Sequence, residues 1–383
     1  MRVVQLRQDR ASGRASLLIG VAGPVFVAGL ATLLAGGVQI LTNGGIYDIV
    51  LLFGINAIMV VGYQVFVGNA GIVSFGHVAF MGLGAYAAGI VSVPSTLKST
   101  VLPTVPHFLA HTQFGMLPSL LIGGVTAAVF ALVAGSAILR LSGAAASIAT
   151  LGLLIIVNNL LSNAAAFTNG PQSFFGVPDT TNFAWVFVSL IVVVALSAWL
   201  KWSPLGLRAR AVRENTVAAE SSGVRRVRSR LWPFILSAFI TGIGGALYAH
   251  DLTAFSPASF YVPQIVGILA MAILGGLNSI SGALTGAALI SFLNEGLRRL
   301  ETGVTIGPVH IGPAVGISQA VLGVVLIAML RWRPAGLLGA LELEIDPRRP
   351  PRARDVDGGE TLSGALNVKD ASTPTGDLPG RAP

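Results

Sequence analysis

The sequence predicts an all-α protein, a polytopic bundle of about ten transmembrane helices, with eight as the lower count. Three observations lead to this fold class. Apolar residues make up 53% of the 383 residues and charged residues only 10%, whereas ordinary soluble domains carry about 25% charged residues. The charges are also unevenly placed, with only four between residues 15 and 200. Finally, apolar runs recur along the chain, most of them near the roughly 20 residues that a spanning helix needs.

Ten runs are apolar enough to be expected spans. They are Ala15–Leu41, Ile46–Phe66, Gly71–Val93, Leu117–Leu139, Gly143–Asn163, Phe183–Leu200, Leu231–His250, Pro263–Leu277, Gly282–Leu297 and Ala314–Leu330. The first follows a basic segment, as in a signal peptide, but its apolar part is longer than a signal peptide needs and shows no clear cleavage site, so we expect an uncleaved span. The eighth and ninth are short, and we expect tilted or broken helices, or one re-entrant pair.

The distribution of basic residues orients the bundle. Eight of them lie between Lys201 and Arg230, whereas residues 163–182 and 251–262 contain none. Because loops rich in Lys and Arg stay in the cytoplasm, both termini and the Lys201–Arg230 loop are expected there. Arg298 and Arg299 fall on the outer side in this topology, against the rule.

The chain divides into three expected parts. Residues 1–14 form a cytoplasmic N-terminus, residues 15–341 the transmembrane domain, and residues 342–383 a disordered cytoplasmic tail rich in Pro, Gly, Asp and Arg. Many of the 47 glycines lie within the spans. The small-xxx-small spacing of Gly282 and Gly286 predicts close packing between helices.

Several function classes are excluded by the sequence. The chain has no Cys, so disulfides and thiolate metal sites are absent. No G-x-x-x-x-G-K-[ST], H-E-x-x-H or G-x-S-x-G pattern occurs. The net charge of +8 comes from short arginine clusters between apolar runs, a membrane pattern rather than a nucleic-acid surface. We therefore expect no enzyme, no cofactor, no metal and no nucleic-acid partner.

An ion- or proton-coupled secondary transporter is the alternative from another class. Such proteins usually carry ionisable groups inside the membrane. Here Asp48, Asp251 and Glu295 are the acids near the bilayer, and all sit near span ends. Glu295 is the best candidate for an intramembrane charge, but the favoured interpretation is an end-of-helix residue that pairs with Arg298 or Arg299 at i, i+3 or i, i+4. This scarcity favours an energy source outside the chain.

A glycine-rich stretch, GNAGIVSFGHVAFMGLGAYAAG, runs from Gly68 to Gly89. Its glycines thin one helix so that other helices approach closely. His77 can line a pathway or form a hydrogen bond between helices. The residues expected to line a pathway or to pack helices are Ser74, Gly76, His77, Phe80, Gly82, Gly84 and Tyr86.

The basic loop contains the pattern of a short docking helix. Asn215 can cap a helix over Val217–Ser222, and Gly223 can end it in a left-handed conformation. Ala218 and Ala219 offer a small surface that can enter a groove on another protein. A helix this short is poorly stable alone, so we interpret it as a docking element.

These stretches resemble the LivM-like family of branched-chain amino acid ABC transporter permeases. The early stretch is similar to that family's S-x-G-H-x-A-F-x-G-x-G-A-Y helix. SPLGLRARAVRENTVAAESSGVRRVRSRLWPFILSAFITGIGGALYA, Ser203 to Ala249, resembles its cytoplasmic coupling loop, with Thr216 where a second acid is common. Weaker likenesses lie at Arg331–Gly339 and Phe167–Asp179. The resemblance covers Ile46 to Gly339.

The resemblance implies an inner-membrane importer subunit that works in a complex. Its expected partners are a second permease subunit, two ATPase subunits that bind the ATP, an extracytoplasmic solute-binding protein and membrane lipid. Branched-chain amino acids are the expected solute, with urea, short amides or other carboxylates left open. The outer loops at Leu97–Leu117 and Phe167–Asp179 would receive the binding protein. The residues expected to couple to the ATPase are Arg213, Glu214, Asn215, Ala218, Ala219, Glu220, Ser221 and Gly223.

Overall fold

The computed structural model describes residues 45–101, 112–301, 304–306, 309–311, 316–332 and 336–337. The expected first span at Ala15–Leu41, the N-terminus before it and the tail at 342–383 lie outside the described residues, as do residues 102–111 of the predicted loop Leu97–Leu117.

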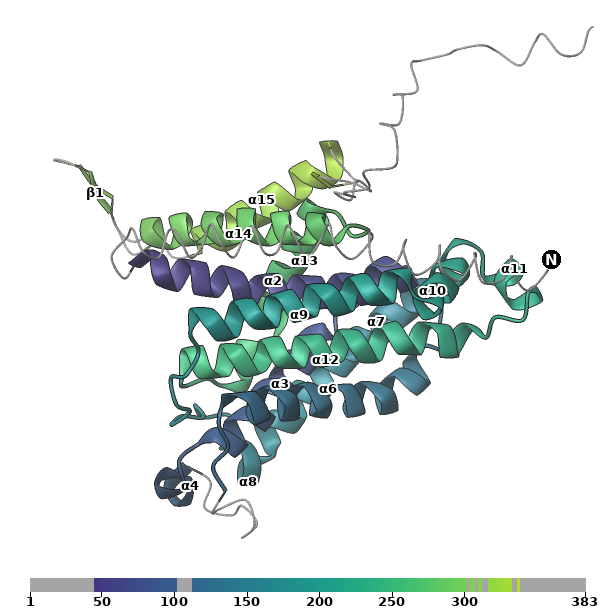
Figure 1. Ribbon diagram of the computed structural model, residues 1–383. Helices are drawn as coiled ribbons and strands as arrows, with labels where there is room; N and C mark the ends of the chain where they lie inside the picture. Colours follow the sequence, from purple (N-terminus) through teal and green to yellow (C-terminus); the bar gives the residue numbers. More distant parts are fainter. Residues whose placement is uncertain are drawn as a thin grey trace, which may run out of the picture. The chain divides into compact units, whose positions relative to one another are not determined.

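The described chain is almost entirely helical (Figure 1), as the sequence predicts. Its longer helices are α2 (Gly45–Ala70), α3 (His77–Ser92), α6 (Met116–Ile138), α7 (Gly143–Asn163), α9 (Phe183–Trp202), α10 (Pro204–Glu214), α12 (Arg226–Leu252), α13 (Val262–Gly275), α14 (Ile280–Glu301) and α15 (Ile317–Trp332). Short elements are α4 (Ser95–Val101), α8 (Ala165–Thr168), α11 (Thr216–Ser221), the 3₁₀ turn η1 (Pro257–Phe260) and the antiparallel pair β1 (Val304–Ile306) and β2 (Val309–Ile311).

Seven of the described helical segments are long and apolar enough to cross a membrane, and two shorter apolar ones lie at 77–92 and 320–329. The polytopic helical bundle is therefore confirmed, while the count of about ten spans stays a prediction. The expected third span at Gly71–Val93 is wrong at its start. Gly71 has a left-handed φ of +69°, and the helix begins only at His77, because the chain must turn back there after α2.

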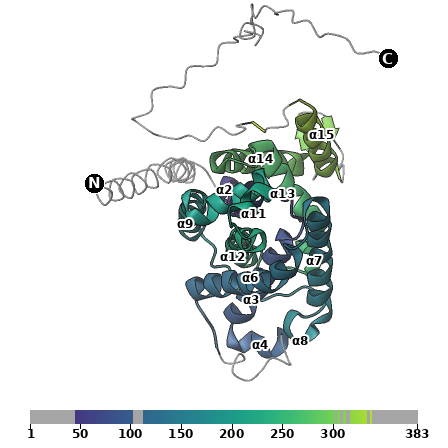
Figure 2. The same ribbon diagram turned by 90° about the vertical axis from the view of Figure 1, so that its right-hand side faces the viewer.

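Helix α12 lies at the centre of the bundle, against α3, α6 and α2 (Figure 2). The contacts are close because glycines face backbone. A Cβ added at Gly84 of α3 would collide with the carbonyl of Gly242 in α12, and one at Gly245 would collide with the backbone of Met81. The glycines of the 68–89 stretch thus act in helix packing, as predicted.

Helices α13 and α14 form a tight antiparallel pair. An added Cβ at Gly275 would collide with Gly282, and one at Gly286 would collide with the backbone of Met271, so the predicted close packing at this spacing is confirmed. Helix α13 has only 14 residues and follows η1, which fits the predicted broken helix. Helix α14 has 22 residues, so the expectation of a short ninth span is wrong.

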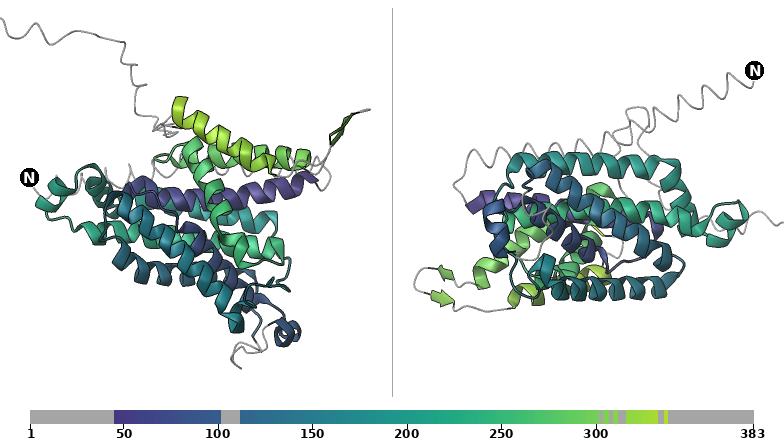
Figure 3. Two further views of the ribbon diagram at one scale, coloured as in Figure 1. Left: turned by 180° about the vertical axis from the view of Figure 1, so that it is seen from behind. Right: turned by 90° about the horizontal axis from the view of Figure 1, so that it is seen from below.

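The two ends of the bundle differ. The α10–α11 hairpin projects at one end (Figure 1), and the β1–β2 hairpin lies at the other in the rear view of Figure 3. The region expected as the Lys201–Arg230 loop is therefore mostly helical, and α12 begins at Arg226, earlier than the expected Leu231.

Candidate functional site

The α10–α11 hairpin is built by local capping. Ser203 accepts a hydrogen bond from the Gly206 amide at 3.3 Å and precedes Pro204, a favoured first helical residue. Asn215 ends α10 and caps α11, its Oδ1 accepting from the Ala218 amide at 3.0 Å. Gly223 follows with a φ of +80°. The predicted cap, short helix and left-handed glycine are therefore present, with the helix at Thr216–Ser221.

The exposed face of α11 differs from the expected one. The prediction that Ala218 and Ala219 together form the docking surface is wrong for Ala219, which is only 6% exposed. It is buried because α11 folds back against α10 and the start of α12. Ala218 stays exposed, and Val217 is 75% exposed. Val217 and Ala218 therefore both lie on the free face of α11.

Arg213 joins the hairpin to the bundle. Its guanidinium donates to the Gly68 carbonyl in the last turn of α2, and to Asn278 Oδ1 at 2.9 Å in the turn before α14. It also donates to Glu214 Oε1 at 2.6 Å. Gly71 leaves space for it, because an added Cβ there would collide with the Arg213 side chain. One side chain thus connects three separate segments.

A second contact ties α11 to another part of the bundle. Glu220 pairs with Arg226 at 3.8 Å, and Arg226 donates to the Arg140 carbonyl at 3.1 Å, between α6 and α7. Ser221, in contrast, is exposed and its hydroxyl only donates within α11. The hairpin is therefore connected by polar contacts to α2, to the α13–α14 turn and to the α6–α7 turn.

The α3 residues singled out from the sequence lie inside the subunit. Ser74, Gly76, His77, Phe80, Gly82, Gly84 and Tyr86 are nearly all fully buried. Tyr86 packs against Phe174, Phe255 and Phe260. Of the two roles left open for this stretch, the structure supports helix packing.

His77 makes the predicted helix-to-helix hydrogen bond. Its Nε2 lies 2.6 Å from Ser237 Oγ of α12, and its Nδ1 lies 2.8 Å from Ser74 Oγ. Ser237 donates its single proton to the Gly62 carbonyl of α2 at 2.6 Å. His77 Nε2 must therefore donate to Ser237 Oγ. This chain of hydrogen bonds connects α2, α3 and α12.

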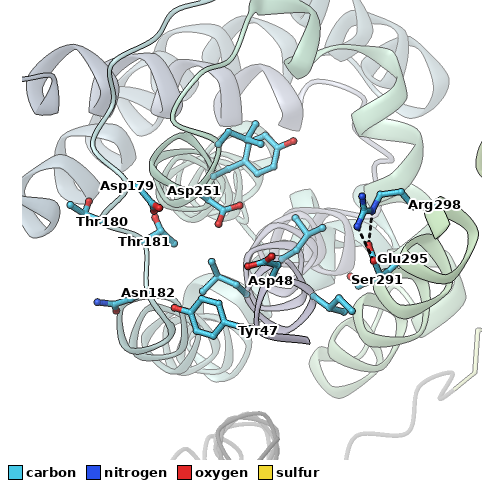
Figure 4. Close-up of a pocket in the computed structure, with 15 residues that line it drawn as sticks. Tyr47, Asp48, Asp179, Thr180, Thr181, Asn182, Asp251, Ser291, Glu295 and Arg298 are labelled. Carbon is cyan, nitrogen blue, oxygen red and sulfur yellow. Dashed lines mark hydrogen bonds and ion pairs between the residues drawn. The ribbon is translucent and has the colours of Figure 1, made fainter. Parts of the chain in front are cut away.

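A cavity of about 820 Å³ opens at the end of the bundle opposite to the hairpin. It gathers four carboxylates, and Asp48, Asp179 and Asp251 point toward one another across it (Figure 4). Glu295 pairs with Arg298 at 2.7 Å, which confirms the predicted i, i+3 ion pair. Four carboxylates face one guanidinium, so the cavity is electronegative.

The assembly of this cavity was not predicted, although a signal existed. The topology from the arginines puts Asp48, Asp179, Asp251 and Glu295 on the same outer side. Its ion pair also accounts for Arg298 on that side, since Glu295 offsets the charge. The side chain of Arg299 lies outside the described residues.

The two loops that the sequence places on the outer side are partly held by buried contacts. Lys98 of α4 is 1% exposed, and its Nζ donates to the Thr112 carbonyl. Burial lowers the pKa of its ammonium group. Phe174, in the loop Phe167–Asp179, pairs with Phe255 through backbone hydrogen bonds of 2.7 and 2.9 Å. Residues 171–173 of this loop remain exposed.

Comparison with known proteins agrees with this architecture. Residues 45–330 match the family model described as branched-chain amino acid transport system / permease component. The chain is 28% identical to the high-affinity branched-chain amino acid transport system permease protein LivM of Salmonella typhimurium, over 85% of this chain and 73% of that protein. It is 27% identical to LivM of Escherichia coli, over 78% and 71%.

The likeness extends to permeases named for another solute. The ribose import permease protein RbsC of Haemophilus influenzae is 25% identical over 64% of this chain and 75% of its own length. No solved structure matches the chain. The match to the family model covers most of the chain, including α2 to α14 and the α10–α11 hairpin, and the chain is therefore a multi-pass membrane protein that belongs to the family of permease components of branched-chain amino acid transport systems.

Proposed function

We propose that this chain is the membrane-spanning, non-catalytic subunit of an ATP-driven importer for branched-chain amino acids. Separate ATPase subunits bind the nucleotide, a second permease subunit completes the pathway, and an extracytoplasmic binding protein delivers the solute. The observation that carries the proposal is the α10–α11 hairpin, with Val217 free and Arg213 joined to α2 and the α13–α14 turn. Closure of the ATPases would move the hairpin and, through Arg213, the inner ends of these helices.

The outer cavity supports a solute that is not a net anion. Its four carboxylates would repel a second free carboxylate such as that of an acidic amino acid, but would tolerate an ammonium group. Branched-chain amino acids meet this condition, and the names of the two LivM relatives mention them. In proteoliposomes with all partners, leucine uptake should be reduced by excess isoleucine or valine and unaffected by glutamate. Inhibition by urea or short amides instead would contradict the assignment of the solute.

The coupling role is tested at Val217. A charge there would sit in the groove of the ATPase partly desolvated, while the fold of this chain would tolerate it because the side chain is exposed. Val217→Glu should abolish uptake and reduce co-purification of the ATPase, with normal membrane levels. Val217→Thr, of nearly the same shape, is the control. Full uptake by both Val217→Glu and Ala218→Glu would remove the coupling assignment.

Orientation is tested with single cysteines, since the chain has none. Gln172→Cys, in the exposed part of the outer loop, should react with an impermeant thiol reagent in spheroplasts. Val217→Cys should react only after the membrane is opened. The reverse pattern would overturn the cytoplasmic placement of the hairpin.

A cation-coupled secondary transporter is the second candidate, because the outer cavity gathers carboxylates that could take up a proton or cation. This candidate predicts solute uptake by the chain alone, driven by a proton or sodium gradient and lost in Glu295→Gln. The importer proposal predicts no uptake without internal ATP and the partner subunits.

A further inference from the structure

A second cavity lies beside the α10–α11 hairpin and has a volume of about 540 Å³. It is lined by α10, by the turn after α11 and by the start of α12. The lining residues are Leu205, Arg208, Ser222, Gly223, Val224, Arg225, Arg228, Ser229 and Trp232. Three guanidinium groups and no carboxylate line this cavity, which gives it the charge of an anion site.

The three arginines of this cavity are exposed. The nearby acids, Glu214 and Glu220, pair with arginines outside the cavity. Within the described part of the chain, the side chains of Arg208, Arg225 and Arg228 form no ion pair or hydrogen bond. Three cations that line one cavity without a counter-charge repel one another, so an anion bound among them would stabilise this arrangement.

The cavity lies where the apolar spans end. Trp199 of α9 and Trp232 of α12 are 50% and 46% exposed, and Trp is typical of the level of the lipid headgroups. Leu207 of α10, 53% exposed, places apolar surface on the same hairpin. Along the chain Arg208 directly follows Leu207, and Arg225 and Arg228 precede Trp232 by seven and four residues. The wall of the cavity is therefore part apolar and part cationic, like the boundary between acyl chains and headgroups.

We propose that this cavity binds the headgroup of an anionic phospholipid. Guanidinium groups match phosphate oxygens in charge and geometry, and basic pockets at the cytoplasmic ends of transmembrane helices suit such headgroups. The cavity is larger than a phosphate ion requires, and Leu205 and Trp232 provide an apolar side for the glycerol and acyl carbons. Because the Ser222–Val224 turn forms one wall, a bound lipid steadies the end of α11 against α12.

The first test measures lipid preference of the full-length chain without partners. Native mass spectrometry counts phosphatidylglycerol and phosphatidylcholine retained from an equal mixture. Wild type should prefer phosphatidylglycerol roughly tenfold, and Arg225→Gln/Arg228→Gln should lose most of this preference. The control Arg140→Gln/Arg331→Gln removes the same charge from exposed residues outside the cavity and should keep the preference for phosphatidylglycerol. If the two double variants show the same preference for phosphatidylglycerol, the proposal is overturned.

The second test leaves the arginines unaltered. Phosphatidylglycerol brominated on its acyl chains should quench Trp232 fluorescence more strongly than brominated phosphatidylcholine, with Trp232→Phe identifying that signal. Reversal of this quenching by low millimolar inorganic phosphate would contradict a lipid site and indicate a small-anion site.

The arginine variant has one further outcome that would contradict the proposal. Reduced co-purification of the ATPase with Arg225→Gln/Arg228→Gln, at unchanged lipid preference, would assign this surface to the ATPase.

Discussion

The centre of the bundle and the α10–α11 hairpin are built on opposite principles. At the centre, α3, α6 and α12 meet through glycines, with no space for a methyl group at Gly84 or Gly245. The hairpin is short and exposed, and a few polar contacts of Asn215, Arg213 and Glu220 hold it. From this difference we predict that the centre sets whether the chain folds, and that the hairpin, in its proposed coupling role, sets whether a folded chain transmits movement. Variants should therefore divide into folding losses and coupling losses.

The largest effect is expected from a bulky side chain at the centre. Gly245→Val places its Cβ against the backbone of Met81, which has no side-chain freedom with which to yield. We expect a loss on the order of 3 kcal/mol or more and little folded protein, measured by size-exclusion chromatography from detergent extracts. Gly152→Ala in α7 is the control, since no atom lies within 4 Å of its added Cβ. A normal yield of Gly245→Val would contradict the tight packing.

The second effect should spare folding and affect transport. Arg213→Gln removes charged hydrogen bonds worth about 1.5–3 kcal/mol, so uptake should fall roughly tenfold or more at normal membrane level. Asn278→Ala should act in the same direction and more weakly. If Arg213 acts through Asn278, the double variant should lose less than the sum of the two single losses. Wild-type uptake by Arg213→Gln would show that the hairpin does not transmit through this residue.

A smaller change at the centre should affect stability alone. Ser237→Ala removes the partner of His77 Nε2 and the bond to the Gly62 carbonyl. Such bonds between membrane helices contribute about 0.6–1.7 kcal/mol, so the melting temperature in detergent should fall while uptake remains. Ser136→Ala, at an exposed serine bonded within its own helix, should melt like wild type. Lost uptake with unchanged melting would instead place His77 in the transport pathway.

Most of the fold could be predicted because the signals are local. Apolar length located the spans, and Asn215 and Gly223 located α11, since a cap and a left-handed glycine act on adjacent residues. The predictions that were wrong concern features that depend on contacts between distant segments. Ala219 is buried only because α11 folds back onto α10 and α12, which no periodicity in six residues reveals.

The cavity of four carboxylates illustrates the same limit. The sequence predicts that these carboxylates lie on one side of the membrane, but it does not show which helices are neighbours. Whether the carboxylates meet depends on the contacts of α2 with α14 and α9, which are far apart along the chain. The prediction of where α3 begins was wrong for a related reason. The apolar run continues through residues 71–76, although Gly71 turns the backbone.

The smallest expected effect is at the cap of α11. Asn215→Ala removes the acceptor for the Ala218 amide, which costs about 1 kcal/mol of local helix stability. Hydrogen exchange at residues 216–222 should become about fivefold faster, with a moderate loss of uptake. Asn215→Asp keeps a capping oxygen and should behave nearly like wild type. The melting temperature should stay constant in both variants, because α11 lies outside the centre formed by α3, α6 and α12. A lower melting temperature of Asn215→Ala would mean that the hairpin belongs to the cooperative core. The division between folding losses and coupling losses would then not hold.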